Sequence, residues 1–100
     1  MNEHRKHPRL PLDVQVNLRE YAIARSKDIS RKGLGLISEN PLTVGTIYNL
    51  TFHMPDSQEE IKAFGKVRWV NQVSENYHES GIEFWDIDDQ DRKKIEAYFS

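Results

Sequence analysis

The chain has 100 residues, of which 30% are charged and 37% hydrophobic, with a net charge of −2 and no cysteine. This length suits a single domain, the missing cysteine excludes disulfides and cysteine zinc sites, and the charge balance argues against non-specific binding of nucleic acid. No apolar run approaches the ~20 residues of a membrane span, and no apolar stretch follows the N-terminus as in a secretory signal, so we expect no membrane insertion and a cytoplasmic location.

Residues 1–11 are polar and basic, and Pro8 and Pro11 keep the local chain out of a helix. We expect this segment to form a flexible N-terminal arm. The remainder of the chain, residues 12–100, is then expected to form the folded domain.

The domain shows the period-two alternation of half-buried β-strands, in which apolar and polar residues point to opposite faces. Leu12, Val14, Val16 and Leu18 share one face of the first predicted strand. Glycine, proline and polar segments separate the strands, and residues 28–33 are predicted to form a turn. The six predicted strands cover approximately residues 12–18, 21–27, 34–38, 47–54, 61–70 and 80–84.

The period changes near the C-terminus. Ile95, Tyr98 and Phe99 follow the spacing of an amphipathic helix, and Asp88 is a candidate N-cap. We expect a helix over approximately residues 89–99. Short strands with tight turns and one terminal helix predict a mainly β fold, a small antiparallel barrel with a C-terminal α-helix.

Positive charge is local rather than spread along the chain. It forms one cluster in the arm and another further along: Arg5, Lys6 and Arg9, then Arg25, Lys27, Arg31 and Lys32. Two compact clusters suit a small anionic ligand better than a polymer. We therefore expect no nucleic acid polymer as a partner.

Two short motifs carry the functional signal. Arg5 and Arg9 lie four residues apart in the arm, and Asp28, Ser30 and Gly33 follow with spacings of two and three. Arginine forks match phosphate and the O6 and N7 acceptors of guanine, whereas a carboxylate accepts from its ring N–H and amino donors. A serine adds an adaptable hydroxyl, and a glycine lets the backbone turn sharply and approach a ligand. Together these groups supply what a guanine nucleotide needs.

At these residues the sequence resembles the PilZ domain family, bacterial receptors for the second messenger cyclic di-GMP. The family pattern is R-x-x-x-R followed further along the chain by D/N-x-S-x-x-G, and both motifs are complete here. The resemblance continues through later landmarks and covers nearly the whole chain: Gly33-Leu34-Gly35-Leu36, Leu42-Thr43-Val44-Gly45, Gly65-Lys66-Val67-Arg68-Trp69 and Gly81-Ile82-Glu83-Phe84. It implies a six-stranded β-barrel with a C-terminal helix.

The resemblance also implies ligand contacts. Arg5 and Arg9 would contact phosphate and guanine, Asp28 and Ser30 would contact guanine or phosphate, and Gly33 would serve backbone shape. A turn with a glycine at positive φ is the purely structural alternative for the second motif. Secondary candidates for the same site are Lys6, Arg31, Trp69 and Gly81.

Two of these secondary candidates also suit a structural role. Trp69 shares its predicted strand face with alternate small and apolar residues, and we expect it to pack in the barrel or against its rim: Ile61, Ala63, Gly65 and Val67. Gly81 is expected either to let a ligand approach the sheet or to serve packing.

The sequence offers no catalytic or metal-binding constellation. The four histidines are scattered, and the acidic stretch at residues 86–91 lacks the glycine and the final acid of a calcium loop. Nothing in the spacing indicates a nucleophile triad or a phosphate loop. We therefore expect no enzyme activity, no metal and no cofactor, with cyclic di-GMP as the ligand.

The expected function is that of a cyclic di-GMP sensor whose arm and surface change on binding. The resemblance implies control of motility, adhesion or exopolysaccharide through an effector protein or a homodimer. One alternative is a PilZ-like protein–protein adaptor that does not bind nucleotide. A second alternative is a barrel that binds single-stranded nucleic acid, but the sequence lacks the basic groove with stacking aromatic residues that such a barrel needs. A third alternative is an enzyme that acts on a nucleotide.

Overall fold

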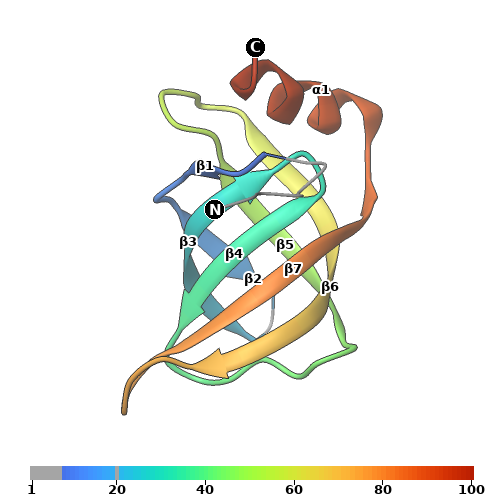
Figure 1. Ribbon diagram of the computed structural model, residues 1–100. Helices are drawn as coiled ribbons and strands as arrows, with labels where there is room; N and C mark the ends of the chain where they lie inside the picture. The colour runs from blue at the N-terminus through green and yellow to red at the C-terminus, as the bar shows by residue number, and fades with distance from the viewer. Residues whose placement is uncertain (1–7, 20) are drawn as a thin grey trace.

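The computed structural model describes residues 8–19 and 21–100, and this part of the chain forms an antiparallel β-barrel with one terminal helix (Figure 1). The strands follow the order β1-β3-β2-β5-β6-β7-β4 around the sheet, and β4 also pairs with β3 to close the ring. The strands are β1 (Leu10–Pro11), β2 (Gln15–Leu18), β3 (Ala22–Ser30), β4 (Gly33–Ser38), β5 (Ile47–His53), β6 (Glu60–Gln72) and β7 (His78–Ile87). The predicted six-stranded barrel with a C-terminal helix is thus confirmed, with β1 as an additional short strand.

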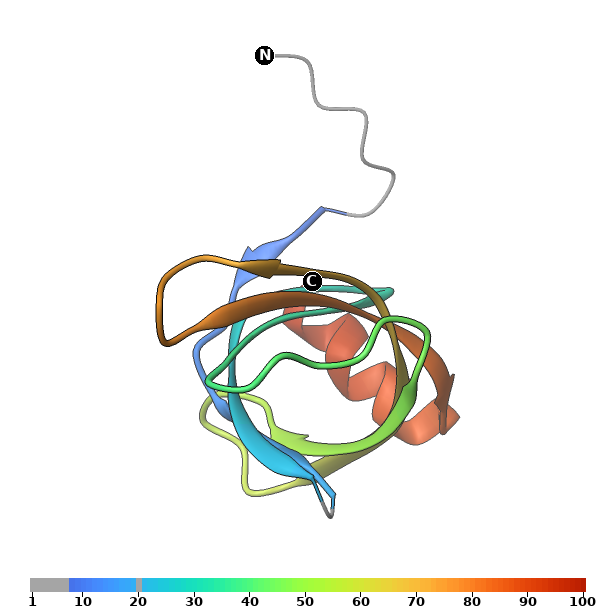
Figure 2. The ribbon, with the colours of Figure 1, turned by 90° about the horizontal axis from the view of Figure 1, so that it is seen from below.

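The barrel encloses one apolar core, and the helix α1 (Asp89–Tyr98) lies across one end of it (Figures 1 and 2). Alternate residues of the strands point inward, as the period-two pattern predicts, and Val16, Leu50 and Ile61 are completely buried. Ile95 of α1 is 2% exposed and joins the same core. Asp88 occupies the N-cap position, but its side chain makes no capping bond to any residue that the structure describes. Within the described residues, no helix is long and apolar enough to cross a membrane.

The first predicted strand, residues 12–18, is wrong in its start: only Gln15–Leu18 form a strand, β2, and the short strand β1 precedes it at Leu10–Pro11. The Ser26 hydroxyl of β3 accepts a hydrogen bond from the Val14 amide (2.9 Å) and donates one to the Leu12 carbonyl (2.6 Å). These bonds add to two backbone hydrogen bonds between the same segments, from the Leu12 amide to the Lys27 carbonyl (3.1 Å) and from the Ser26 amide to the Val14 carbonyl (2.9 Å). Strand β1 lies alongside the end of β3, with Leu10 opposite Ile29. The chain just before β1 is thereby brought onto the barrel beside the second motif. Residues 1–7, the larger part of the predicted arm, lie outside the described residues.

The predicted turn at residues 28–33 is wrong in its extent. Strand β3 continues to Ser30, and only the two residues Arg31 and Lys32 connect it to β4. The cause is burial, because Ile29 of the motif is completely enclosed in the core and pairs with Leu34 across the hairpin. The Ser30 hydroxyl accepts a hydrogen bond from the Lys32 amide (3.1 Å), which stabilises the short connection.

The purely structural alternative for this motif, a glycine at positive φ, does not hold at Gly33, since the described glycine with a positive φ is Gly45. Gly33 is needed for a different reason. A Cβ atom at this position would collide with the backbone carbonyl of Ile82 on β7. The glycine therefore lets β7 pack closely against the start of β4.

Candidate functional site

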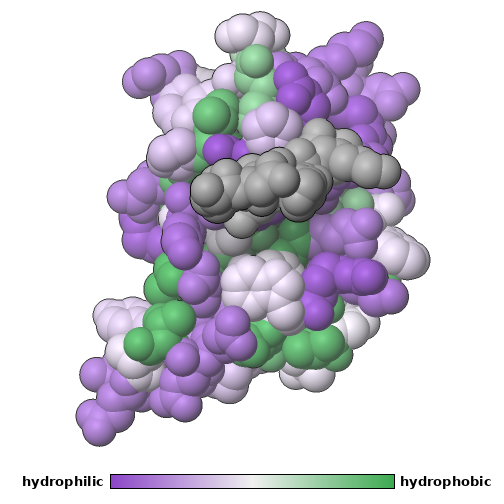
Figure 3. Space-filling view, viewed as in Figure 1, coloured by the Kyte–Doolittle hydropathy of each residue, from purple (hydrophilic) through white to green (hydrophobic). Residues whose placement is uncertain are grey.

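The candidate site is a cavity of about 760 Å³ on the outer face of β3, β4, β7 and β6. Its lining combines both predicted motifs with residues of the later strands: Arg9, Lys27, Asp28, Ser30, Lys32, Gly33, Gly35, Arg68, Trp69, Glu79, Gly81, Ile82 and Glu83. Figure 3 views this side of the molecule, where hydrophilic side chains predominate.

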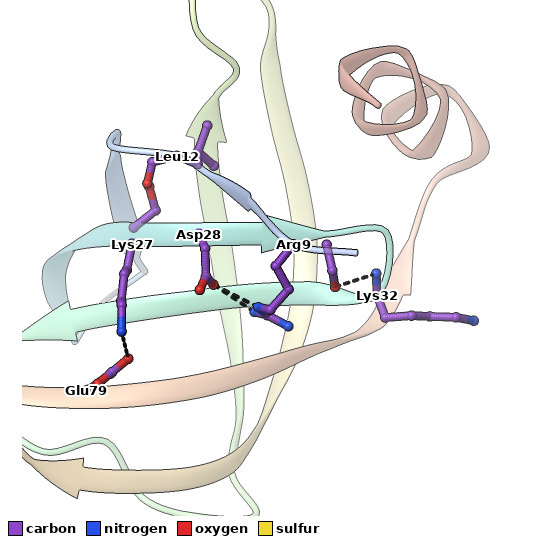
Figure 4. A network of polar contacts seen from close by, with 8 residues as sticks. Arg9, Leu12, Lys27, Asp28, Lys32 and Glu79 are labelled. Carbon is purple, nitrogen blue, oxygen red and sulfur yellow. Dashed lines mark hydrogen bonds and ion pairs between the residues drawn. The ribbon is translucent and has the colours of Figure 1, made fainter. Parts of the chain in front are cut away.

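An ion pair joins the two motifs at one edge of this cavity. Arg9 donates from Nε (3.0 Å) and from Nη2 (2.9 Å) to the same oxygen, Oδ1 of Asp28. Both side chains remain 27% exposed, so the pair is held on the barrel yet accessible from the cavity. Figure 4 shows the two side chains meeting above β4. Hydrogen bonds between two charged groups are stronger than neutral ones, so this contact fixes Arg9 beside Asp28.

A β-bulge in β3 supplies a further charged side chain, Lys27, which the sequence analysis placed in a basic cluster but not among the individual ligand contacts. The pairing of β3 with β4 shifts register between Ser26 and Asp28, so the consecutive residues Lys27 and Asp28 both reach the outer face. Lys27 extends across β4 to Glu79 of β7, with 2.6 Å between Nζ and Oε2 (Figure 4). The hydrogen bond to this carboxylate raises the pKa of Lys27 above its ordinary value.

A second β-bulge lies on the opposite side of the cavity, in β6. The register of β6 against β7 shifts between Val67 and Trp69, so Arg68 and Trp69 both face outward. Trp69 was expected to pack in the barrel or against its rim; the first alternative is wrong, because the side chain lies on the outer face and is 43% exposed. Arg68 is paired with Glu83 at 3.4 Å.

The structure brings most of the predicted site residues together. Asp28, Ser30, Gly33, Trp69 and Gly81 line the same cavity as Arg9, although Ser30 is only 2% exposed. Their assignment as ligand contacts stays a prediction.

Arg31, a secondary candidate, does not line this cavity. It forms an ion pair with Glu96 of α1 (2.8 Å) and lies over the ring of Phe99. It thus ties the β3–β4 connection to the helix. Arg5 and Lys6 lie outside the described residues.

Several lining residues were missed by sequence reasoning. Lys27 and Arg68 were missed because strict alternation places neighbouring residues on opposite faces, and a bulge leaves no clear signal in one sequence. Gly35 belongs to a quoted landmark, but nothing local indicated which side chain lies over it. The remaining additions come from the β3–β4 connection inside the second motif and from β7: Lys32, Glu79, Ile82 and Glu83.

The charges of the site are arranged in opposed pairs. Arg9, Lys27 and Arg68 each have a carboxylate partner, whereas Lys32 has no acidic partner within the described part of the chain. A phosphate group of a ligand could therefore bind the cationic side chains already held at the rim, and N–H donors of a ligand could donate hydrogen bonds to the carboxylates. Within residues 8–19 and 21–100, no cluster of three His, Cys, Asp or Glu side chains is placed to hold a metal ion.

Fold and site together define a small β-barrel with a polar groove on its outer face. The family model of the PilZ domain matches residues 3–100, and the chain belongs to this family. No curated protein matches the sequence.

Solved structures share the fold over nearly the whole chain. The Bacillus subtilis inhibitor of motility MotI/DgrA aligns with a TM-score of 0.76 at 22% identity, over 97% of this chain and 50% of that one. The complex of K. pneumonia MrkH with c-di-GMP gives a TM-score of 0.77 at 21% identity, over 98% and 51%. The PilZ domain of Escherichia coli YcgR with c-di-GMP gives 0.66 at 13% identity, over 94% and 87%. The chain therefore spans about half the length of MotI and MrkH.

Proposed function

We propose that this PilZ domain is a receptor for cyclic di-GMP and that the ligand binds in the groove on β3, β4, β7 and β6. The observation that carries the proposal is the ion pair of Arg9 with Asp28, which joins motifs 19 residues apart at the edge of one cavity. The volume of about 760 Å³ falls within the usual range for small-molecule sites, about 300–1,000 Å³. The c-di-GMP complexes of MrkH and YcgR, which share the fold, support the choice of ligand.

Each charged group has a role in this proposal. The Arg9 guanidinium can donate two parallel hydrogen bonds to phosphate or to O6 and N7 of guanine. Asp28 can accept from N1–H and the amino group of guanine, whereas adenine presents an acceptor at N1. Lys32 is placed to neutralise phosphate, and the exposed indole of Trp69 offers a stacking surface for a base. Because Arg9 is already held at the cavity, binding needs to order less of the site.

Arg5 and Lys6 remain proposed ligand contacts, and both lie outside the described residues. The proposed change of the arm on binding concerns the same segment. In the described part, Arg9 is already paired with Asp28 and β1 with β3, so residues 9–11 lie on the barrel. Amide exchange with and without ligand tests the change, and amides before Pro8 that are strongly protected in the free protein would rule out an ordering switch.

The output of the receptor is proposed to be regulatory rather than enzymatic. Ligand binding would alter the barrel surface and the contacts with an effector protein or with a second copy of the chain. Processes such as motility, adhesion or exopolysaccharide control follow from the family resemblance.

Calorimetric titration with cyclic di-GMP tests the proposal, with cyclic di-AMP, GTP and a short oligonucleotide as competing ligands. Arg9→Ala should weaken cyclic di-GMP binding about 10- to 150-fold, the equivalent of losing a hydrogen bond to a charged group of about 1.5–3 kcal/mol. Asp28→Ala should weaken it too and should also reduce the preference over cyclic di-AMP.

A matched control comes from a second arginine–aspartate pair outside the groove. Arg25 and Asp13 lie 2.8 Å apart and are 58% and 79% exposed. Arg25→Ala should leave the affinity unchanged. If a folded wild-type protein does not bind cyclic di-GMP, or if Arg9→Ala binds as well as Arg25→Ala, the proposed site is refuted and the adaptor without nucleotide becomes the better description.

A further inference from the structure

One row of cross-strand partners crosses the groove from end to end. Asp28 of β3 is opposite Gly35 of β4, Gly35 is opposite Gly81 of β7, and Gly81 is opposite Trp69 of β6. All four residues line the cavity. The two inner positions carry no side chain, so the side chains of the two outer positions can lie over their backbone.

Gly35 makes room for the carboxylate of Asp28. A Cβ atom at residue 35 would lie 2.5 Å from Oδ1 and 3.3 Å from Cγ of Asp28, well inside normal contact. The missing side chain thus lets the carboxylate rest over β4, where its Oδ1 receives both hydrogen bonds from Arg9. Any side chain at position 35 would displace the same oxygen that Arg9 holds.

Gly81 makes room for the indole of Trp69 in the same way. A Cβ atom there would collide with the ring nitrogen Nε1 and would lie 2.5 Å from Cε2 and 2.9 Å from Cδ1. The bulge in β6 turns Trp69 outward, and the glycine lets its ring settle on β7 rather than project into solvent.

Other glycines of the barrel face obstacles of a different kind. At Gly33 the obstacle is the backbone of β7, and at Gly65 it is the core side chains Ile82 and Leu50. Those two glycines serve packing. At Gly35 and Gly81 the nearest obstacles are side chains of the groove itself. Glycine weakens a strand, and an outward-facing position accepts most residues, so the packing of the barrel does not explain this pair.

We propose that Gly35 and Gly81 are positioning residues of the site, Gly35 for Asp28 and Gly81 for Trp69. Gly35 then determines base selectivity, because it places the acceptor that distinguishes guanine from adenine. Gly81 determines affinity for either base, because it places a stacking surface that is insensitive to the base edge. The inference on selectivity rests on the proposed binding of cyclic di-GMP.

A double-mutant cycle tests the role of Gly35. Gly35→Ala should weaken cyclic di-GMP binding about tenfold or more and reduce the preference over cyclic di-AMP by a similar factor. Combined with Asp28→Ala, it should cause no further loss, because the displaced carboxylate is already absent. If Gly35 had only a structural role, the affinity losses of Gly35→Ala and Asp28→Ala would add in the double variant, and Gly35→Ala would leave the preference between the two cyclic dinucleotides unchanged. Either result would overturn the proposal for Gly35.

The cycle on thermal unfolding needs no ligand. If Gly35→Ala lowers Tm in the wild-type background, it should cause no further decrease in the Asp28→Ala background, where the carboxylate is absent. If Gly35→Ala alone does not fold, the double variant should fold. If wild type does not bind cyclic di-GMP, the proposed function fails while this cycle still decides whether Gly35 acts through Asp28. An additive loss of Tm would refute the positioning role independently of the ligand.

Tryptophan emission tests the role of Gly81. The chain contains two tryptophans, and Trp85→Phe leaves Trp69 as the sole reporter, since Trp85 lies outside the cavity. In that background, Gly81→Ala should shift the emission of the free protein to the red and weaken both cyclic dinucleotides by the same factor. Unchanged emission in a folded variant would overturn the proposal for Gly81. If Gly81→Ala does not fold, recovery of the fold by the added change Trp69→Ala supports the proposal, and continued failure refutes it.

Discussion

Ser26 is expected to hold the N-terminal motif in place, and its removal should cost far more stability than its size suggests. The residue is 4% exposed, and its hydroxyl bonds both the Val14 amide at 2.9 Å and the Leu12 carbonyl at 2.6 Å. In Ser26→Ala both backbone groups lose their partner at the break between β1 and β2. An unsatisfied buried polar group costs about 1–3 kcal/mol, and the Val14 amide, which is only partly buried, stands at the low end of about 1 kcal/mol. The expected loss in free energy of unfolding is therefore about 2–4 kcal/mol.

Urea unfolding followed by circular dichroism measures this loss. With a slope of about 1.5 kcal/mol per M, a loss of about 2–4 kcal/mol lowers the midpoint by about 1.3–2.7 M urea. The slope itself should stay unchanged if the native fold is retained. Because Arg9 directly precedes β1, a less firmly held β1 in Ser26→Ala should also lower the affinity for any ligand that Arg9 binds.

A second buried serine provides the matched control. Ser80 is completely buried, and among the described residues its Oγ has no hydrogen-bond partner. Ser80→Ala removes an unpaired hydroxyl, so it should leave the free energy of unfolding unchanged or raise it. Equal losses in Ser26→Ala and Ser80→Ala would refute the reasoning, because burial of a hydroxyl rather than its bonds would then decide the cost.

Three further outcomes follow from the structure. Gly33→Ala should lower the free energy of unfolding by about 1–3 kcal/mol or more, because its Cβ meets the backbone of β7, and a stability within error of wild type in urea would contradict this. Tyr98→Phe removes the hydrogen bond from the phenol to the Pro11 carbonyl (3.0 Å) and should cost about 0.5–1.5 kcal/mol, whereas no loss would mean that water replaces the bond. Glu79 raises the pKa of Lys27, so the stabilisation from this pair is complete below the ordinary lysine pKa of about 10.4 and is lost as pH rises through the higher pKa of the folded state. Glu79→Gln should therefore remove the decrease of Tm at alkaline pH that this pair causes. An identical pH profile of Tm in wild type and variant would exclude the pair as the source of the decrease.

The alternation of apolar residues was sufficient to predict the strands and the inside of the barrel. Val16, Leu50 and Ile61 lie inward because a period of two admits only two faces, and burial selects the apolar one. The helix was predicted to within one residue at its C-terminal end, because Ile95 begins a stripe that only a helical period brings together. The two motifs were likewise sufficient to indicate the family.

The local reading failed where tertiary contacts overrode a local preference. The turn predicted at residues 28–33 became mostly strand because Ile29 is completely buried. The first predicted strand begins late, at Gln15, because the Ser26 hydroxyl of β3 takes up the Val14 amide and the Leu12 carbonyl, which regular strand pairing would use.

The sequence by itself thus determined most of the strands, the helix and the family, because periodicity and residue type are local properties. Only the tertiary structure decided the composition of the groove. Bulges in β3 and β6 place Lys27 and Arg68 on the outer face beside Asp28 and Trp69, against the alternation of each strand. The pairing of Gly35 with Gly81 depends on the register between β4 and β7. Register and bulges are set by how neighbouring strands fit together around the closed barrel, and no single segment contains that information.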